Sequence, residues 1–364
     1  MPPESLTSSK SDPQGDAGLS YRDAGVNIDA QDQALSRAKG AIRSTFGPGV
    51  LGDVGLFGGL FDLAAAGCEG HILVASADGV GTKLEVARRA GIYDTVGRDL
   101  VNHCIGDVLA QGARPLFFLD YVGTGVLEPE VVSSLIEGCA NACRESGVAL
   151  LGGETAEMPG LYQKGDFDLV GFLVGAAPRE RLLDGSRVAA GQRLIGLRSS
   201  GLHTNGYSLA RKICFERLGL ECDSRPEGLE GRSVAEALLE PHRCYLGPVW
   251  PLMEAGQVCA LAHITGGGLK DNLVRVLGEQ DAVIDRSQWE VPALFRFLVE
   301  NGGVADEEAY RAFNMGIGLV LVVEAAEEDA VLERLRQSGE DPVRLGELVP
   351  GTGQVRWLGE DPSA

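Results

Sequence analysis

The feature that most constrains the fold of this chain is a repeated step from a short apolar segment, through a glycine-bearing polar turn, into a segment with helical spacing. Glycine is accordingly abundant: 51 of 364 residues, about twice the usual ~7% share. The pattern predicts a mixed α/β fold for the first half. It places strands at 71–77, 115–122, 148–151 and 168–177, and helices at 82–90, 94–113 and 128–147.

The alternation is interrupted at 176–192, where charged residues, Gly and Pro replace the apolar pattern. We place a domain boundary there, with an N-terminal α/β domain at 21–177 and a C-terminal α+β domain at 178–364. Residues 1–20 are rich in Ser, Pro, Gly and Asp and lack an apolar core segment, so they are expected to form a disordered tail and not a signal peptide. In the second domain we expect strands at 193–200 and 316–326 and helices at 206–219 and 327–339.

Charge and cysteine usage exclude several classes of protein. The 32 Lys and Arg residues against 52 Asp and Glu give a formal net charge of −20, which disfavours a nucleic-acid or membrane-surface partner. The longest apolar segment, 316–323, is too short to cross a bilayer. The eight cysteines contain no C-x-x-C pair and are expected to be buried, reduced thiols. A cytoplasmic protein is therefore expected.

The segment Asp78-Gly79-Val80-Gly81-Thr82-Lys83 joins a predicted strand to a predicted helix. Unpaired N–H groups at a helix start suit an anion, and the two glycines allow a phosphate to approach the backbone. Asp78 offers a hard oxygen ligand for Mg²⁺, and Lys83 offers a cation for a phosphate oxygen. The spacing is not that of a Walker A loop. A tight turn with an aspartate cap explains the same residues equally well.

Further acids lie at positions where burial would require a partner. Asp107 lies in a largely apolar helix and Asp120 closes an apolar strand, although helix exposure and a strand-end turn explain them too. Glu154 and Glu157 fall in 152–160, which we interpret as a constrained loop after a strand. Open α/β sheets bind ligands at such loops. Paired carboxylates there can share a metal ion or fix the amine and hydroxyl groups of a substrate.

Two polar, glycine-rich segments in the second half are the remaining candidates. Segment 199–206 places His203 among hydroxyls and an Asn, where it can contact phosphate or sugar oxygens and exchange a proton near neutral pH. Segment 263–268 runs through Gly266, Gly267 and Gly268 into a predicted helix and suggests a phosphate cradle. Asn314 is interpreted as a turn former.

The order of these motifs carries more information than any one of them. From Tyr21 to the last predicted strand the chain resembles the phosphoribosylformylglycinamidine cyclo-ligase family, also called aminoimidazole ribonucleotide (AIR) synthetases. GGETAEMPG and PLFFLDY are particularly specific. The motifs are DAGVNIDA, FGGLFDL, DGVGTKL, PLFFLDY, LGGETAEMPGLY, SSGLHTNGYSL, HITGGGL and FNMGIG.

The resemblance implies an ATP-dependent ring closure in purine biosynthesis. The γ-phosphate of ATP is transferred to the formamide oxygen of formylglycinamidine ribonucleotide, an amidine nitrogen attacks the activated carbon, and phosphate leaves as the imidazole ring forms. Phosphorylation converts a poor leaving group into a good one, so the protein mainly positions the reactants and neutralises charge. ATP and Mg²⁺ are the implied cofactors.

The resemblance also implies an architecture and a set of site residues. The N-terminal domain is expected to pair across a homodimer into a β-barrel, with ATP near the dimer contact and a small nucleotide as substrate. Mg²⁺ would be held by Asp78 and Asp107. ATP phosphates would meet Lys83 and Lys39, together with the turns containing Gly79, Gly81, Thr82, Gly266, Gly267 and Gly268. The catalytic residues would be His203, Glu154 and Lys39.

Several positions depart from the pattern of the family. Gly106 stands where the family usually has Asn, and His242 where it has Thr. Asn27, Ala77 and Ala312 replace Asp, Thr and Thr. Two alternatives therefore stay open: a sister ATP-dependent kinase or synthetase of the same superfamily, and a catalytically weakened nucleotide-binding protein. A gain of activity on restoring Asn at position 106 would favour the latter.

Overall fold

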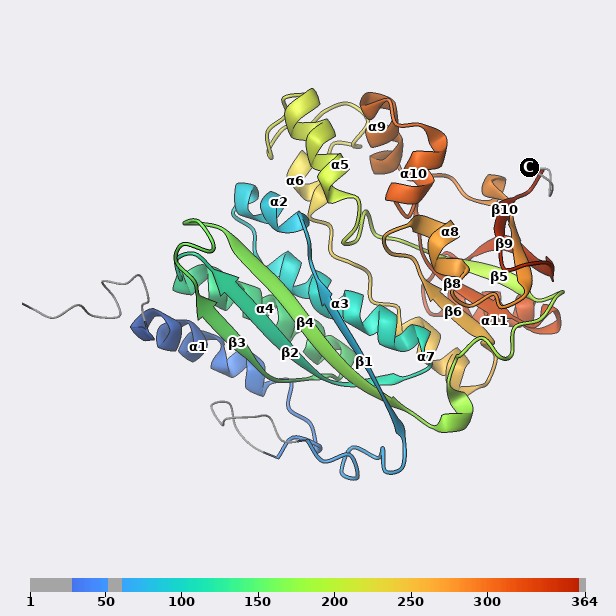
Figure 1. Ribbon diagram of the computed structural model, residues 1–364, viewed down its shortest axis with the longest axis horizontal. Coiled ribbons are helices and arrows are strands. Elements are labelled where there is room, and N and C mark those ends of the chain that lie inside the picture. Colours follow the sequence, from blue (N-terminus) through green and yellow to red (C-terminus); the bar gives the residue numbers. More distant parts are fainter. Residues whose placement is uncertain (1–27, 52–60, 360–364) are drawn as a thin grey trace, which may run out of the picture.

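The computed structural model describes residues 28–51 and 61–359, which form two halves with one β-sheet each (Figure 1). The expected tail and Asn27 lie outside the described residues. The first half contains α1 (Ile28–Arg43), β1 (Ile72–Gly79), α2 (Lys83–Ala90), α3 (Asp94–Ala110), β2 (Arg114–Thr124), α4 (Pro129–Ser146), β3 (Ala149–Glu157) and β4 (Phe167–Ala177).

The second half begins its sheet at Arg193 and ends it at Trp357. Its strands are β5 (Arg193–Arg198), β6 (Ala260–His263), β7 (Gln280–Ile284), β8 (Ile317–Val323), β9 (Val343–Pro350) and β10 (Val355–Trp357). Its helices are α5 (Tyr207–Arg211), followed by a π turn at Lys212–Arg217, α6 (Val234–Leu238), α7 (Leu246–Glu254), α8 (Gly268–Leu273), α9 (Ala293–Gly302), α10 (Asp306–Ala312) and α11 (Glu328–Gln337).

The first sheet has the strand order β1-β4-β2-β3, and the helices among the described residues cover one of its faces (Figure 1). Strand β4 runs antiparallel to both β1 and β2, while β3 is parallel to β2. Helices α3 and α4 pack against the sheet and each other, and α1 packs on α4 (Figure 1). The two main helices approach closely because Gly97 and Gly138 lack side chains: a Cβ at either position would lie within 2.3 Å of a carbonyl oxygen of the facing helix.

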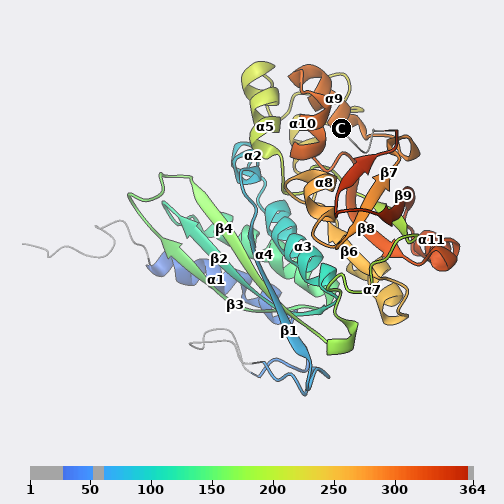
Figure 2. The same cartoon turned by 45° about the vertical axis from the view of Figure 1, so that its right-hand side comes forward.

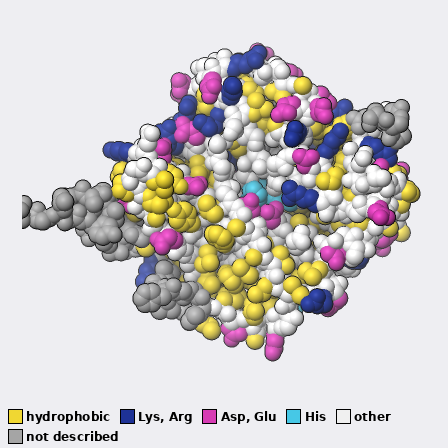
Figure 3. Space-filling model, in the orientation of Figure 1, with side chains coloured by type: hydrophobic (Ala, Val, Ile, Leu, Met, Phe, Trp, Pro, Cys, Tyr) yellow, Lys and Arg dark blue, Asp and Glu magenta, His cyan; other side chains and the backbone are white. Residues whose placement is uncertain are grey.

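The uncovered face of this sheet is apolar. Strand β1 alternates strictly between exposed and half-buried residues, as expected for a strand with one open face. Leu73 and Phe172 on that face are 53% and 48% exposed. Figure 3 shows hydrophobic side chains gathered over this sheet. Apolar side chains gathered in this way, unlike apolar residues scattered singly, are typical of a protein–protein interface.

The second sheet has the order β10-β7-β9-β5-β8-β6, with the entirely buried strand β8 between β5 and β6. Helices α7 and α11 pack on one face through residues such as Val249, Leu252 and Leu332, while α8, α9 and α10 belong to the opposite side (Figure 2). Helix α3 of the first half contacts both β6 and α7, so it forms the main joint between the halves.

Most predicted elements are confirmed within a few residues, with one correction. The segment 152–160 was expected to be a loop, but β3 continues through Glu157 because residues 152–157 pair with β2. Glu154 and Glu157 are therefore strand residues. All eight cysteines are unpaired, as expected; six are buried, whereas Cys222 and Cys244 are half-buried. No helix in the described ranges is both long and apolar enough to span a membrane.

Candidate active site

Two carboxylates from different elements of the first half meet across one hydroxyl. Asp78 is the penultimate residue of β1 and Asp107 lies in the last turn of α3. The Ser76 hydroxyl lies 3.0 Å from Asp78 Oδ2 and 3.2 Å from Asp107 Oδ2. The structure thus brings together the two acids that the sequence paired for Mg²⁺. Two carboxylates and a hydroxyl are hard oxygen donors of the kind that this ion prefers.

The surroundings shift the pKa values of these two acids in opposite directions. Burial, and then the charge of Asp107, raises the pKa of Asp78 from 3.8 to about 6. Burial acts in the same direction on Asp107, but the hydrogen bond and charge of His263 outweigh it and hold the pKa of Asp107 below its usual 3.8. Both groups are therefore anionic at neutral pH, and a cation between them would relieve their repulsion.

Four of the chain's five histidines meet beside these acids. His103 comes from α3, His263 ends β6, and His203 and His242 lie in segments before α5 and α7. The His203 and His242 rings stack with centroids 4.0 Å apart. The other neighbouring rings are 5.1 to 5.4 Å apart, and all four side chains are buried.

Hydrogen bonds join this histidine cluster to the acids. His263 Nδ1 lies 2.8 Å from Asp107 Oδ1, and its Nε2 lies 3.0 Å from His242 Nε2. His103 Nδ1 lies 2.7 Å from the Thr204 hydroxyl, and its Nε2 lies 3.5 Å from Asp78 Oδ1. Burial lowers the pKa of His103 to about 4, so this ring is neutral at physiological pH.

A groove of about 240 Å³ gives access from solvent to Asp107, one acid of the pair, and to Ser76. Its walls come from β1 and α3 of the first half and from β6 and α8 of the second, and they include Ser76, Asp107, His263, Asn272 and the exposed Arg275. Figure 3 shows histidine and acidic side chains together in a hollow between the halves. Carboxylates on one wall and a guanidinium on another can accommodate a phosphate bound through a cation.

Lys83 does not face this groove. Its side chain is fully buried, and its ammonium lies 2.7 Å from Asp99 Oδ2. It also donates to the backbone carbonyls of Glu240 at 2.8 Å and His203 at 3.2 Å. Burial lowers the pKa of Lys83, against the charge of Asp99. In this structure Lys83 holds the second half against the first and presents no exposed ammonium to a phosphate.

The predicted glycine turns are present at the junction between the halves. Gly79 ends β1, Gly81 has a φ of +67° that favours glycine, and the Thr82 hydroxyl lies 3.1 Å from that of Ser208. Gly267 and Gly268 have φ of 93° and 63°, and a Cβ on Gly268 would lie 1.9 Å from a carbonyl oxygen. The Asn272 amide donates to the carbonyls of residues 265, 266 and 268 and fixes this turn.

The three expected catalytic residues lie in different surroundings. His203 is fully buried with a φ of 63°, and its Nε2 accepts a hydrogen bond from the Ser200 N–H at 3.3 Å. Burial lowers the pKa of His203 well below 6.5. Glu154 is exposed on strand β3, and Lys39 is half-buried on α1. The structure therefore places His203 within the histidine cluster, and Glu154 and Lys39 on separate elements.

Asn314 does more than form a turn. It is 4% exposed, its side-chain oxygen accepts from the Ser199 hydroxyl at 2.8 Å, and its amide donates to the Gly201 carbonyl at 2.9 Å. The start of the 199–206 segment is thereby fastened to the second sheet.

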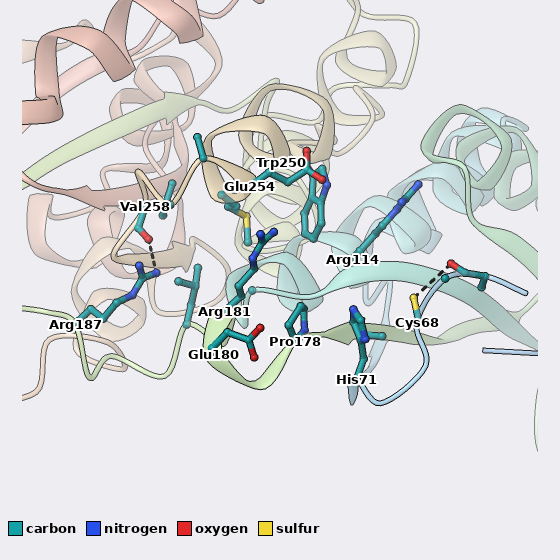
Figure 4. A pocket seen from close by; sticks show the side chains of 18 residues that line it. Cys68, His71, Arg114, Pro178, Glu180, Arg181, Arg187, Trp250, Glu254 and Val258 are labelled. Atoms are coloured by element: carbon teal, nitrogen blue, oxygen red, sulfur yellow. Dashed lines mark hydrogen bonds between the residues drawn. The ribbon is translucent and has the colours of Figure 1, made fainter. Parts of the chain in front are cut away.

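A second cavity lies away from these residues. It measures about 430 Å³ and is lined by Arg114, Arg181, Arg187, Trp250 and their neighbours, where the start of β2 meets α7 (Figure 4). Arg187 donates to the Val258 carbonyl at 2.6 Å. None of the predicted site residues lines this cavity, so its size does not make it the candidate active site.

Comparison with known proteins gives a consistent family. Residues 61–177 match the family described as AIR synthase related protein, N-terminal domain, and residues 189–358 match the corresponding C-terminal domain. The chain is 44% identical to the phosphoribosylformylglycinamidine cyclo-ligase of Alkaliphilus metalliredigens (strain QYMF), over 93% of this chain and 97% of the relative. The chain belongs to the phosphoribosylformylglycinamidine cyclo-ligase family.

Further comparisons agree with this family. The chain is 48% identical to the cyclo-ligase of Nitrosococcus oceani (strain ATCC 19707 / BCRC 17464 / JCM 30415 / NCIMB 11848 / C-107), over 95% of this chain and 96% of the relative. Among solved structures, thiamine-monophosphate kinase from Stenotrophomonas maltophilia K279a superimposes with a TM-score of 0.68, at 20% identity over 90% of this chain and 96% of the kinase. That likeness establishes a shared fold only.

Two departures from the pattern of the cyclo-ligase family meet at His263. A Cβ on Gly106 would lie 2.5 Å from His263 Cε1 and 2.7 Å from both ring nitrogens, so the bare glycine makes room for the imidazole. His242 Nε2 lies 3.0 Å from Nε2 of the same imidazole. Gly106 and His242 therefore both contribute to the position of His263: the glycine leaves room for its ring, and His242 contacts it.

Sequence reasoning missed the functional environment of His103, His242 and His263. Each histidine occurs alone in the sequence, more than 20 residues from its nearest partner, so no spacing motif joins them. The available signal was compositional: a chain with only five histidines carries one in each of three segments already suspected of chemistry. Asp99 was also missed, because a helical acid is ordinarily solvated.

Proposed function

We propose that this chain catalyses the ATP-dependent closure of formylglycinamidine ribonucleotide to 5-aminoimidazole ribonucleotide, the cyclo-ligase reaction of purine biosynthesis. The observation that carries the proposal is the 44–48% identity to named cyclo-ligases over 93–95% of this chain. The acid pair at the interdomain groove supports it, because phosphoryl transfer requires a site that concentrates negative charge around a cation.

The acid pair and the Ser76 hydroxyl fit Mg²⁺. Asp78 and Asp107 would hold the ion, with Ser76 ordering both carboxylates through its hydroxyl. When bound, Mg²⁺ supplies charge neutralisation for the ATP phosphates. Arg275 on the opposite wall and the N–H groups of the two glycine turns would receive the remaining phosphate oxygens.

The protein's own contribution is mainly positional. Lys83 and Asp99 fix the His203 segment and the 240–242 segment against α3, since Asp99 Oδ1 also accepts from the His242 N–H at 2.6 Å. This arrangement keeps the two walls of the groove in register, so that ATP and substrate meet in one geometry. We keep His203, Glu154 and Lys39 as the proposed substrate-side residues.

We also propose that two copies pair through the uncovered face of the first sheet, as the family resemblance implies. Leu73 and Phe172 are about half exposed there, at 53% and 48%. Light scattering on the purified chain should give twice the mass of one chain. Phe172→Glu should give the monomer mass, and Leu358→Glu, at a 64% exposed position in the other half, should not. A monomeric parent protein would contradict this arrangement.

The direct test is turnover. Purified protein with Mg·ATP and formylglycinamidine ribonucleotide should release ADP and an aminoimidazole product in equal amounts. Asp107→Asn keeps the shape of the side chain but removes its charge, and should lower kcat about 10²–10³-fold. Glu308→Gln, an exposed acid on α10, is the matched control and should not change it. ATP hydrolysis without ring closure would reject the proposal.

A further inference from the structure

The acid pair and the histidine cluster together have the composition of a different metal site. His103, Asp107 and His263 each offer one ligand atom, and these atoms all lie within 4.8 Å of one another. Imidazole nitrogens are ligands for zinc and its neighbours, whereas Mg²⁺ is bound almost entirely by oxygen. We infer that these three residues bind a borderline-soft divalent metal ion, of which Zn²⁺ is the type.

Each of the two histidines already has a hydrogen-bond partner on the ring nitrogen that would not bind the metal. A metal-binding imidazole usually engages a hydrogen-bond partner with its other nitrogen, which fixes the ring and the tautomer. His103 Nδ1 contacts the Thr204 hydroxyl at 2.7 Å, which leaves Nε2 facing Asp78. His263 Nε2 contacts His242 Nε2 at 3.0 Å, which leaves Nδ1 facing Asp107. Both free nitrogens therefore point toward the acids.

The hydrogen bonds allow an imidazole here to offer a lone pair to a cation. Metal ions bind neutral imidazoles and ionised carboxylates. His103 can keep its proton on Nδ1, against the Thr204 hydroxyl, and leave Nε2 unprotonated. When His263 binds a metal ion through Nδ1, its one ring proton lies on Nε2 and forms a hydrogen bond to His242 Nε2. The His242 ring carries a buried Nδ1 without a hydrogen-bond partner, which can take the proton that Nε2 then releases.

Ligand number and access favour the same conclusion. Three protein ligands leave the fourth position of a tetrahedral site to water or to Asp78, whose Oδ1 lies 3.5 Å from His103 Nε2. Asp107 and His263 line the 240 Å³ groove, which gives an ion a path from solvent. Because Asp107 is shared, Zn²⁺ and Mg²⁺ would exclude each other. Inhibition of the cyclo-ligase reaction by Zn²⁺ is therefore expected, and this expectation rests on the proposed function, whereas Zn²⁺ binding itself does not.

The test is Zn²⁺ titration by calorimetry of the full chain, stripped of metal and without nucleotide or substrate. One equivalent should bind. His103→Gln should weaken binding by at least about 100-fold and Thr204→Val by about 10-fold. His71→Gln is the matched control, since the His71 ring lies outside the cluster and contacts the Glu69 carbonyl of its own turn at 3.2 Å, and it should bind as the parent does.

Co²⁺ in place of Zn²⁺ supplies a readout that does not depend on any variant. The spectrum should show a low-coordinate ion with nitrogen and oxygen ligands and no thiolate charge-transfer band, which excludes the free cysteines. A thiolate band, binding below half an equivalent, or equal affinities for His103→Gln and His71→Gln would overturn the inference. Absent ring closure with intact Zn²⁺ binding would instead reject only the proposed function.

Discussion

Replacing Gly106 tests how the histidine cluster is held. A Cβ there would lie 2.5 Å from His263 Cε1, and the ring is 5% exposed, with a partner on each nitrogen. The imidazole can move aside only by breaking its bond to Asp107, worth about 1.5–3 kcal/mol, or to His242, worth about 0.5–1.5 kcal/mol. Exchanging glycine for alanine inside a helix returns about 0.5–1 kcal/mol. We therefore expect Gly106→Ala to lower the free energy of unfolding, by at most about 2.5 kcal/mol.

Urea unfolding measures this difference. Gly40→Ala is the matched control, because Gly40 also lies inside a helix but has open space where its Cβ would stand, and it should be stabilising. In a His263→Ala background the cost of Gly106→Ala should vanish. An undiminished cost in that background, or a Gly106→Ala protein as stable as the parent, would refute the reasoning. Gly106→Asn, which restores the usual family residue, should lower ring-closing activity for the same reason.

Three further outcomes follow from buried polar groups. Burial raises the pKa of Asp120 from 3.8 to about 7, so its ionisation opposes folding increasingly from pH 4 to 7. Asp120→Asn should remove that dependence and raise stability at pH 8 by up to about 4 kcal/mol, measured by unfolding across pH. Lys83→Met leaves Asp99 as an unpaired buried charge and should cost about 3–5 kcal/mol in thermal or urea unfolding, part of which Lys83→Met/Asp99→Leu should recover. Asn272→Asp sets a carboxylate against three carbonyls and should raise the KM for ATP in steady-state assays, with a smaller change in kcat.

The sequence predicted local elements well because their signals are local. Helix α4 begins at Pro129 after an acid and ends at Ser146, before Gly147 in the left-handed region, and both signals stand in the sequence. The extent of β3 was missed because glycine and two acids normally end a strand, whereas here pairing with β2 maintains it. That is a tertiary effect which no local pattern contains.

Some residues of the candidate site could likewise be predicted from the sequence, and others could not. Asp78 and Asp107 were paired through family resemblance, and the structure brings them within reach of one hydroxyl. The surroundings of Lys83 could not be predicted, because its partners include carbonyls from residues 120 and 157 positions away. A lysine after a glycine turn has the same sequence whether it faces a phosphate or the interior.

The buried ammonium of Lys83 also bears on how the chain comes to be folded. As the ribosome releases the first half, the carbonyls at 203 and 240 do not yet exist, so this ammonium must stay hydrated beside Asp99 at the start of α3. The N-terminal sheet is thus expected to reach its final packing only after residue 240 has been synthesised. Expressed separately, the two halves should show poor solubility and should recover it when mixed.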